Sequence, residues 1–563
     1  MTSPDMDEQA VPPIERDRHR IIKCAQKLFS YAKMHPFDLA LYLLIFAVGI
    51  AIRSLVLWNY GSVQTDEAAH SVGGVFISRL VLNGFQDPFA FGSRYLTDYP
   101  ATVGGIWFYP LTYGLLSSPG FLLFGVSGFL ARIISALFSV LLIHASVLVS
   151  KEIDHDHRVN LVTAFLVATS SILVIVGSGA MLDVPQVALT MYTILFWFRA
   201  VNNHDSSAFL KAGILGGLTG LIKPTGIFIL LFMMVFQKAA SFISGQKDVF
   251  SKGFRKGMIA GFLIFSIWWV SAFFVYFVFG GQVGGGALEG VGYWFNIFGV
   301  FGKYLPPWYS PAWTTYEGWT YYSDVLIAVM GILPFVFSFV GVLSRSKKFT
   351  RNDWAIILFA LSTYAIQSFA SNKNPRYIIT CLPILYIYSS IGFVDVCSSM
   401  DKLGARMKRA VAIPKLATIF TIFIFLAGAV MPLYSAINMQ YVPGMGYGKN
   451  YPVAESVRII KNDGSEGIIV SDSEDNFINF IILTFYVAPI DGERRFGCYE
   501  TPSNPEELLS FHSDGKYIEY VIVHDPDSEI SKFIQSNPGY FELIGKAENS
   551  YGSFQVYKVT RHV

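Results

Sequence analysis

Four positions in this sequence place charged side chains at the ends of long apolar segments. Asp66-Glu67 follows the first such segment, Asp183 precedes the fourth, Lys223 lies between the fifth and sixth, and Arg376 opens the tenth. Ionisable groups beside a hydrocarbon layer are costly unless they are paired or functional. A carboxylate can take a proton from an attacking group, and a lysine or arginine can neutralise a phosphate. Together the four positions predict a compact polar site at one membrane surface.

Each of these residues also has a structural interpretation when it is considered alone. A carboxylate pair next to a helix is often only a solvated helix end, and Asp183 before Val184-Pro185 fits a helix N-cap. Lys223 and Arg376 could simply extend their charged ends to the membrane interface. The prediction of a shared site therefore depends on a topology that puts all four on one side.

The composition predicts a membrane protein. Of the 563 residues, 53% are hydrophobic and only 15% are charged, whereas roughly a quarter of the residues in soluble proteins are charged. The net charge of +2 gives no indication of a nucleic-acid partner. The four cysteines form neither a CxxC pair nor a disulfide framework.

Apolar segments of sufficient length occur along most of the chain. A hydrocarbon core about 30 Å thick requires roughly 20 apolar residues in a helix, and on this test we expect about eleven membrane-spanning helices. Proline disfavours helix in the residue before it, so the run at 209–236 is expected to be two helices that meet at Lys223-Pro224. The run Trp107–Gly125 contains Pro110 and Pro119 and is expected to be re-entrant or interfacial. The other segments are Phe37–Trp58, Phe129–Ser150, Leu161–Gly177, Val184–Ala200, Phe254–Phe279, Val325–Leu343, Trp354–Ala370, Tyr377–Val396 and Ala410–Ser435.

Basic residues predict the orientation, because cytoplasmic loops are rich in lysine and arginine. A cytoplasmic N-terminus and an odd number of crossings put the C-terminal segment outside, in a multi-pass protein of the plasma membrane. No cleavable signal peptide is expected, since the first twenty residues are polar and basic. The clusters that this topology places in the cytoplasm are Arg16–Lys33, Lys151–Arg158, Lys238–Lys256, Arg345–Arg351 and Lys402–Arg409.

The expected fold class is an α-helical polytopic membrane protein with a small extracytoplasmic α/β domain. Residues 1–36 are expected to be a cytoplasmic tail, residues 37–440 a transmembrane domain with outer loops at 58–128 and 280–322, and residues 441–563 the outer domain. In the outer domain the patterns predict a helix after Pro452, strands at Gly467–Ser471, Tyr517–His524 and Ser553–Val559, and a helix at Ser528–Gln535.

The outer loop at 280–322 is rich in aromatic residues, including Trp313. Tryptophan and tyrosine gather at membrane interfaces, but their flat faces also suit sugar rings. The glycine runs at 280–281 and 284–286 are typical of a mobile loop that gates a substrate.

With these motifs the sequence resembles the GT-C superfamily of integral-membrane glycosyltransferases, in particular the protein O-mannosyltransferase and aminoarabinose-transferase-like enzymes. The resemblance spans about residues 37–400. The sequence differs from the eukaryotic protein mannosyltransferases, because their central inserted domain is not found in it. The segments that carry it are Thr65-Asp66-Glu67-Ala68, Tyr99-Pro100, Tyr109-Pro110, Ala131-Arg132-Ile133-Ile134-Ser135-Ala136, Leu182-Asp183-Val184-Pro185, Gly220-Leu221-Ile222-Lys223 and Pro375-Arg376-Tyr377.

The resemblance implies inverting transfer of mannose or a related hexose or pentose from a polyprenyl- or dolichyl-phosphate donor. The acceptor would be a hydroxyl or amine of a lipid, glycan or protein at the outer face. Asp66 is then the expected base, because it matches the acidic residue of the first outer loop. A divalent metal is left open as a cofactor.

The other expected roles follow the charge and position of each residue. The catalytic group comprises Asp66, Glu67 and Asp183; the contacts to the donor phosphate are Lys223, Arg376 and Arg94; the contacts to acceptor or sugar are Tyr99, Tyr377 and Trp313; and a metal would be bound by Asp66, Glu67 and His70. His70 shares a helical face with the two acidic residues, although a solvated loop histidine is the commoner case.

A transporter or flippase for a lipid-linked sugar or small solute is the alternative function. Transporters usually place charged groups near the bilayer midplane, within broken helices of paired repeats. Here the charges gather at the segment ends and the sequence contains no repeat, so an enzyme at the interface is favoured.

Overall fold

The structure is a computed structural model of the chain. It describes residues 36–59, 61–103, 106, 109–243, 251–279, 315–370, 373–406, 412–437, 450–473, 478–489, 496–513 and 515–560. The N-terminal tail, most of the aromatic outer loop and Trp313 lie outside the described residues.

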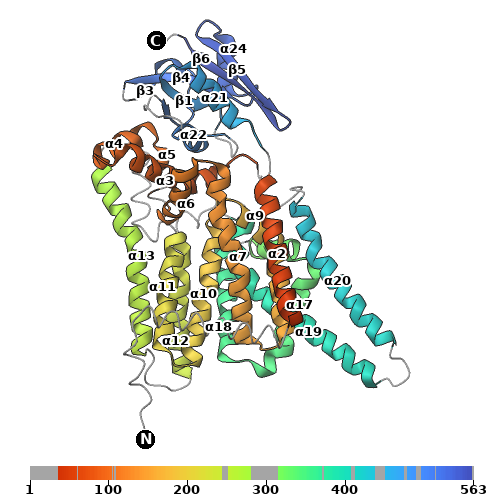
Figure 1. Cartoon of the computed structure of the whole chain (residues 1–563). Coiled ribbons are helices and arrows are strands. Elements are labelled where there is room, and N and C mark those ends of the chain that lie inside the picture. Colours follow the sequence, from red (N-terminus) through yellow and green to blue (C-terminus); the bar gives the residue numbers. More distant parts are fainter. Residues whose placement is uncertain are drawn as a thin grey trace.

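Long apolar helices form a bundle beneath a smaller domain, which is formed by the C-terminal part of the chain (Figure 1). We call the end of the bundle that carries this domain the domain side. The helices of the bundle are α2 (Pro36–Asn59), α7 (Gly128–Ile153), α8 (His157–Thr169), α9 (Ser171–Ser178), α10 (Asp183–Asn202), α11 (Ser206–Ile222), η3 (Pro224–Ile227), α12 (Phe228–Ile243), α13 (Lys252–Phe279), α16 (Tyr316–Met330), α17 (Ile332–Arg345), η4 (Ser346–Lys348), α18 (Arg351–Phe369), η5 (Pro375–Cys381), α19 (Leu382–Arg406) and α20 (Ala412–Ile437).

Five helices within the described residues are long and apolar enough to cross a membrane, or up to seven if each of two bent pairs counts as one span. The polytopic helical architecture is thereby confirmed, and the count of about eleven crossings stays a prediction. The expected break at Lys223-Pro224 is also confirmed, because α11 ends at Ile222 and a short 3₁₀ turn precedes α12.

The segment Val325–Leu343 was expected to be one helix, and that prediction is wrong. α16 and α17 meet at Gly331 with a bend of 110°. Gly331 has a φ of +79°, and a Cβ there would lie 2.4 Å from the carbonyl oxygen of Gly428. Only glycine tolerates this backbone without strain, so the bend is specified by one residue in an otherwise apolar run.

The expected segment Leu161–Gly177 is also not one straight helix, because α8 and α9 meet with a bend of 52°. A buried arginine stabilises this smaller break. Arg53 of α2 donates hydrogen bonds to the carbonyl oxygens of Ala168 (2.8 Å) and Val167 (3.4 Å) and to Ser139 Oγ (2.6 Å). The last carbonyls of α8 have no helical partner where the chain turns. The guanidinium supplies these partners, and its charge is favourable at a helix C-terminus.

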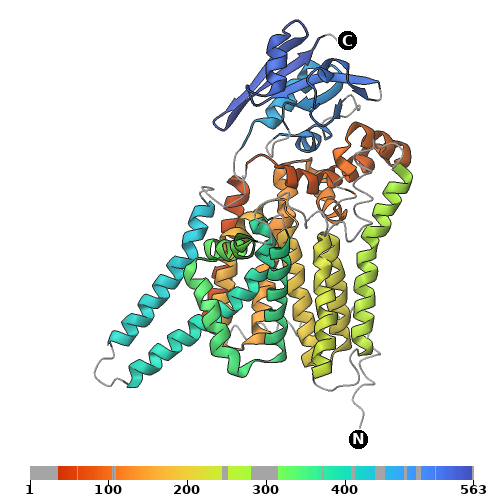
Figure 2. The same cartoon turned by 180° about the vertical axis from the view of Figure 1, so that it is seen from behind.

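A layer of short helices lies across the domain side of the bundle, as both views show (Figures 1 and 2). α6 corresponds to the run Trp107–Gly125, and its 13 residues are too few for a full span. α6 packs closely on α3, since a Cβ on Gly114 would lie 2.8 Å from the backbone nitrogen of Gly74. The elements of this layer are α3 (Thr65–Arg79), η1 (Leu80–Gly84), α4 (Pro88–Asp98), α5 (Ala101–Val103) and α6 (Thr112–Phe124).

The C-terminal domain contains a mixed sheet in the order β2-β1-β4-β6-β5, with β3 paired to β4. β1 is parallel to β2 and β4, whereas β6 is antiparallel to β4 and β5. The predicted helices and strands correspond to α21, β1, β4, α24 and β6. The elements are α21 (Val453–Asp463), β1 (Gly467–Ser471), α22 (Phe480–Val487), β2 (Phe496–Cys498), α23 (Glu507–Ser510), β3 (His512–Ser513), β4 (Lys516–Val523), α24 (Glu529–Ser536), β5 (Phe541–Asn549) and β6 (Gly552–Val559).

The domain and the layer of short helices share one hydrophobic core. Val72 and Tyr95 of the layer belong to the same buried cluster as Ile482 and Phe485 of α22. An ion pair between Lys516 and Asp98 (2.7 Å) adds a polar contact. The domain is therefore packed on the layer and is more than a tethered appendage.

Candidate active site

The first ion pair of the site joins the layer of short helices to the bundle. Asp66 lies in the first turn of α3, where the positive end of the helix dipole favours a carboxylate. Its Oδ2 lies 2.6 Å from Nη2 of Arg376, which comes from η5. Nη1 of the same guanidinium contacts the sulfur of Met181 at 3.3 Å. The side chain of Asp66 is 40% exposed, so this carboxylate is accessible to a substrate.

The second ion pair lies between two helices of the bundle. Lys223 Nζ donates to Asp183 Oδ1 at 2.6 Å. Asp183 begins α10, and Lys223 directly follows the last residue of α11, at the break that Pro224 imposes. The side chain of Asp183 is only 5% exposed, compared with 18% for Lys223. Asp183 is therefore a buried anchor for a lysine whose ammonium retains some access to solvent.

The ring of Tyr377 connects the two pairs. Lys223 Nζ lies 5.1 Å from its centroid, and Arg376 Cζ lies 5.6 Å from the same centroid. Both are within the range of a cation–π contact. The four charged residues predicted from sequence are thus brought together around one aromatic ring.

The ionisation of Asp66 is set by two opposing effects. Burial favours the neutral acid, but the charge and hydrogen bond of Arg376, together with a smaller attraction from His70, outweigh it, so that the pKa of Asp66 lies below its ordinary value. Asp66 is consequently a carboxylate at neutral pH. A carboxylate with a low pKa is a weak base while the guanidinium holds it, and it becomes a stronger base when the guanidinium is drawn away.

Glu67, the neighbour of Asp66, has a different environment. Its side chain is fully buried, and Oε1 accepts hydrogen bonds from Arg132 Nε and the Ala180 nitrogen, each at 2.8 Å. Oε2 accepts from Arg132 Nη2 at 2.8 Å and from the Gln64 nitrogen at 3.2 Å. Both oxygens are saturated, which leaves Glu67 no lone pair directed at a substrate. Its geometry suits a residue that fixes the start of α3 on α7.

Replacement of Glu67 with alanine is expected to destabilise the protein by about 3–5 kcal/mol, because it leaves the guanidinium of Arg132 buried and unpaired. Thermal unfolding in detergent would measure the loss. The matched control is Glu152→Ala at the other end of α7, where the pair with Arg199 is part-exposed and should contribute under about 1 kcal/mol. Equal effects of the two substitutions would contradict the structural role of Glu67.

His70 lies on the same helix, one turn beyond Asp66. Its Nδ1 is 2.8 Å from the carbonyl oxygen of Ala180, so Nδ1 carries the proton in the neutral ring. Tyr109 packs edge-on against the imidazole at 4.5 Å. Burial lowers the pKa of His70. In the described residues no group of three His, Cys, Asp or Glu side chains could hold a metal, so Asp66, Glu67 and His70 do not converge there as a ligand set.

Two other predicted site residues lie in α4 or directly after it. Arg94 is exposed, and its Nε donates to the carbonyl oxygen of Ala90 one turn earlier. Tyr99 is 1% exposed and packs against Tyr95 at 5.0 Å, in the core beneath the C-terminal domain. The predicted contacts of Arg94 with the donor and of Tyr99 with the acceptor or sugar stay predictions. Tyr377, by contrast, lies at the centre of the site.

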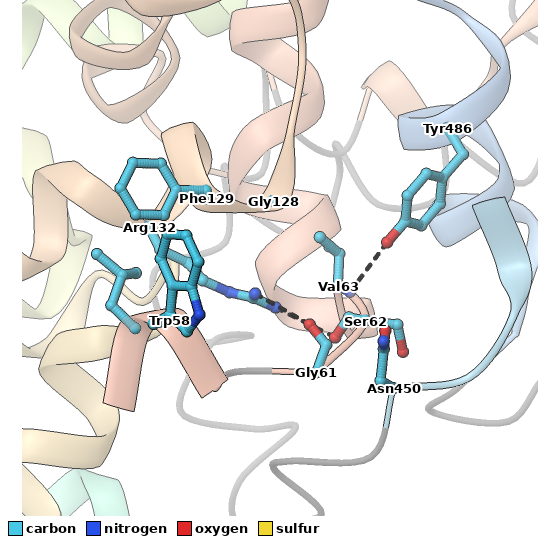
Figure 3. Close-up of a pocket in the computed structure, with 10 residues that line it drawn as sticks. Trp58, Gly61, Ser62, Val63, Gly128, Phe129, Arg132, Asn450 and Tyr486 are labelled. Atoms are coloured by element: carbon cyan, nitrogen blue, oxygen red, sulfur yellow. Dashed lines mark hydrogen bonds between the residues drawn. The ribbon is translucent and has the colours of Figure 1, made fainter. Parts of the chain in front are cut away.

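Several residues that shape the site were not assigned a role from the sequence. Arg132 anchors Glu67 and also donates to the carbonyl oxygens of Gly61 and Ser62, at 3.0 and 3.1 Å (Figure 3). An arginine in an apolar helix indicates a buried polar partner, and this signal was present in the sequence, although it does not say whether the partner is a carboxylate, as for Arg132, or carbonyl oxygens, as for Arg53. Met181 had no such signal, because methionine is ordinary in apolar segments.

The chain matches one family model, described as dolichyl-phosphate-mannose-protein mannosyltransferase, over residues 109–270. No curated protein matches it in sequence.

Solved structures provide broader similarity. The apo structure of ArnT from Cupriavidus metallidurans has a TM-score of 0.57 at 12% identity, and the match covers 92% of this chain and 97% of that one. The same protein bound to undecaprenyl phosphate has a TM-score of 0.58 at 13% identity, over 94% and 98%. The oligosaccharyltransferase of Archaeoglobus fulgidus in its apo form has a TM-score of 0.58 at 15% identity, over 88% and 70%. At these identities the similarity is one of fold.

Proposed function

We propose a glycosyltransferase function from one premise: the chain has the fold of the GT-C membrane glycosyltransferases, as its motifs predicted. The proposed reaction is inverting transfer of a hexose or pentose, such as mannose, from a polyprenyl-phosphate donor to a hydroxyl or amine acceptor. The observation that carries it is the convergence of two cation–carboxylate pairs around Tyr377. The donor class is also supported by the undecaprenyl phosphate of one similar structure and the dolichol-phosphate of another.

In the proposed reaction Asp66 takes the proton of the acceptor as the acceptor attacks the anomeric carbon. A new bond forms from the acceptor oxygen or nitrogen to that carbon, while the bond from the carbon to the phosphate oxygen breaks. The electron pair of the broken bond remains on the polyprenyl phosphate. A single displacement inverts the anomeric centre, and Asp66 later releases its proton to water.

The two cations have a separate task in this scheme. A phosphate leaving group is weakly basic, so it requires neutralisation of charge more than protonation. Lys223 and Arg376 each lie within cation–π distance of Tyr377 and are each held by one carboxylate, so a phosphate in front of that ring would meet two positive charges. Asp183 holds the ammonium of Lys223 in place when the leaving group departs.

The same scheme places the site at the outer membrane face, with the N-terminus in the cytoplasm. Basic clusters at the end opposite the domain side support this orientation. Arg345, in one cluster, pairs with Asp154, in another, at 2.8 Å. Both predicted cytoplasmic loops therefore lie at one end of the bundle, away from Asp66 and the C-terminal domain.

The direct test uses purified protein in nanodiscs with a labelled polyprenyl-phosphate mannose or pentose. Time-dependent release of polyprenyl phosphate with transfer of label to an added membrane extract would support the proposal. NMR of the product linkage would test inversion. Flux of a lipid-linked sugar across proteoliposomes, with no transfer of label, would instead support the transporter or flippase alternative.

The ion pair of Asp66 predicts a difference between two pH profiles. In the free enzyme the lowered pKa of Asp66 keeps the base ionised at acidic pH. The acid limb of kcat/KM should therefore lie at a pH below the usual pKa of an aspartate. A bound phosphate draws Arg376 from Asp66 and adds negative charge, and both effects raise the pKa of the base. The acid limb of kcat should therefore lie at higher pH than that of kcat/KM. Coincident limbs would contradict this exchange of partners.

A further inference from the structure

The C-terminal domain contacts the chain immediately before the catalytic carboxylate. Helix α22 packs on α3 in the layer of short helices, and the two share buried hydrophobic residues (Figures 1 and 2). Phe485 of α22 meets Phe121 of α6 with 6.4 Å between ring centroids. This apolar contact fixes the position of α22 but does not by itself act on Asp66.

Two polar contacts extend from α22 to the residues that precede Asp66. Asn479 Nδ2 donates to Thr65 Oγ1 at 2.7 Å. The hydroxyl oxygen of Tyr486 accepts from the backbone nitrogen of Val63 at 3.2 Å (Figure 3). Thr65 is the residue directly before Asp66 in the first turn of α3.

Asn479 uses both ends of its amide. Oδ1 accepts from the backbone nitrogens of Ile481 and Ile482, at 3.1 and 3.0 Å, which makes Asn479 the N-cap of α22. The residue is 3% exposed. A single buried side chain thus joins the start of a helix in the domain to the start of the helix that carries Asp66.

The opposite side of the same segment is held by the bundle. Arg132 donates to the carbonyl oxygens of Gly61 and Ser62 (Figure 3). Glu67 accepts from the Gln64 nitrogen. The segment 61–67 is therefore fixed between α7 and the domain. Of the two polar contacts from α22 described above, the one from Asn479 reaches closer along the chain to Asp66.

We propose that Asn479 is a positioning residue for the transfer reaction: through Thr65 it holds the first turn of α3 so that Asp66 points at the acceptor. The inference rests on the proposed role of Asp66 as base. It assigns the C-terminal domain a part in catalysis, because a misplacement of about 1 Å in a reacting group can lower a rate by up to about 100-fold.

The test variant is Asn479→Ser, since serine is an equally good N-cap but is too short to reach Thr65. We expect kcat to fall about 10- to 100-fold, with the KM for the donor changed less than about twofold. Thr65→Val should have a similar effect. Thr65→Ser, which keeps the hydroxyl, should retain most of the wild-type kcat. If both residues act through one hydrogen bond, the double variant Asn479→Ser/Thr65→Val should be no slower than either single variant.

A second measurement is independent of activity. Hydrogen exchange of the first turn of α3 should be about fivefold faster in Asn479→Ser, since one buried hydrogen bond is lost. The control is Ser528→Ala, which removes the N-cap of α24 in the same domain. It should lower the stability of the domain without changing kcat or the exchange of α3.

The outcomes separate the two proposals. If the wild-type protein transfers no sugar but α3 exchanges faster in Asn479→Ser, the contact that positions α3 is supported and the proposed function is contradicted. Transfer by wild type with unchanged kcat in Asn479→Ser would overturn the positioning role, whatever the exchange. Equal effects of Asn479→Ser and Ser528→Ala would show a general loss of domain stability and would also overturn it.

Discussion

Replacement of Asp66 with asparagine is expected to lower kcat by about 1,000-fold, within the range of roughly 10² to 10⁴ that a general base contributes. Asparagine has nearly the same shape, so the first turn of α3 should be retained. The side-chain amide cannot take the acceptor proton, and it gives Arg376 a neutral partner in place of a carboxylate. Release of labelled polyprenyl phosphate under saturating donor would measure the change in kcat.

The control is Asp87→Asn, in the same layer of short helices. Asp87 is exposed and caps α4 by accepting from the Ala90 nitrogen, a role that asparagine fills equally well. Its activity should be that of wild type. Full activity in a folded Asp66→Asn protein would rule out Asp66 as the base. The two ion pairs would then be structural contacts at the domain side of the bundle.

Apolar length and proline predicted most of the bundle, because in a bilayer these two features decide where helices form and stop. The break at Pro224 followed from proline alone. The bend at Gly331 did not, since glycine is common in membrane helices and is compatible with a straight one. Gly331 combines a φ of +79° with the close approach of Gly428 on α20, and a tertiary contact of this kind leaves no pattern in the local sequence.

The four charged residues of the site were predictable because each interrupts or ends an apolar segment, and such charges require a reason. The fact that Glu67 follows Asp66 in the sequence did not show that the two carboxylates have different partners. Adjacent residues on a helix point about 100° apart, so Asp66 turns to Arg376 while Glu67 turns inward to Arg132. That partner lies far along the chain on α7, and only the tertiary fold brings the two side chains together.

Helix α22 was missed for a related reason. Its sequence, Phe480–Val487, is apolar on every side, and a short apolar run does not distinguish a helix from a buried strand. Buried on both faces between the sheet and α3, it needs no polar face. The contact of Asn479 with Thr65 could not be expected from sequence, because it depends on how the domain packs on the layer of short helices.

Replacement of Arg376 with glutamine is expected to lower kcat/KM for the donor by about 10²- to 10³-fold, because the leaving phosphate loses a cation that is already in position. Arg376→Lys should be intermediate, since an ammonium retains the charge but cannot reproduce the two-pronged contact with Asp66 and Met181. The same transfer assay, run across donor concentrations, gives both constants.

Loss of the guanidinium has a second consequence that a general loss of positive charge does not have. Without Arg376 the pKa of Asp66 should rise, because burial is then no longer outweighed by attraction. The acid limb of kcat/KM should therefore move to higher pH in Arg376→Gln.

The control is Lys373→Gln, three residues away, where the ammonium donates to the carbonyl oxygens of Gln367 and Ser368. In this variant both the rate and the acid limb of kcat/KM should be unchanged. A slow Arg376→Gln enzyme whose acid limb stays at the wild-type pH would mean that Arg376 contacts the donor without controlling the base, and the exchange of partners at Asp66 would have to be abandoned.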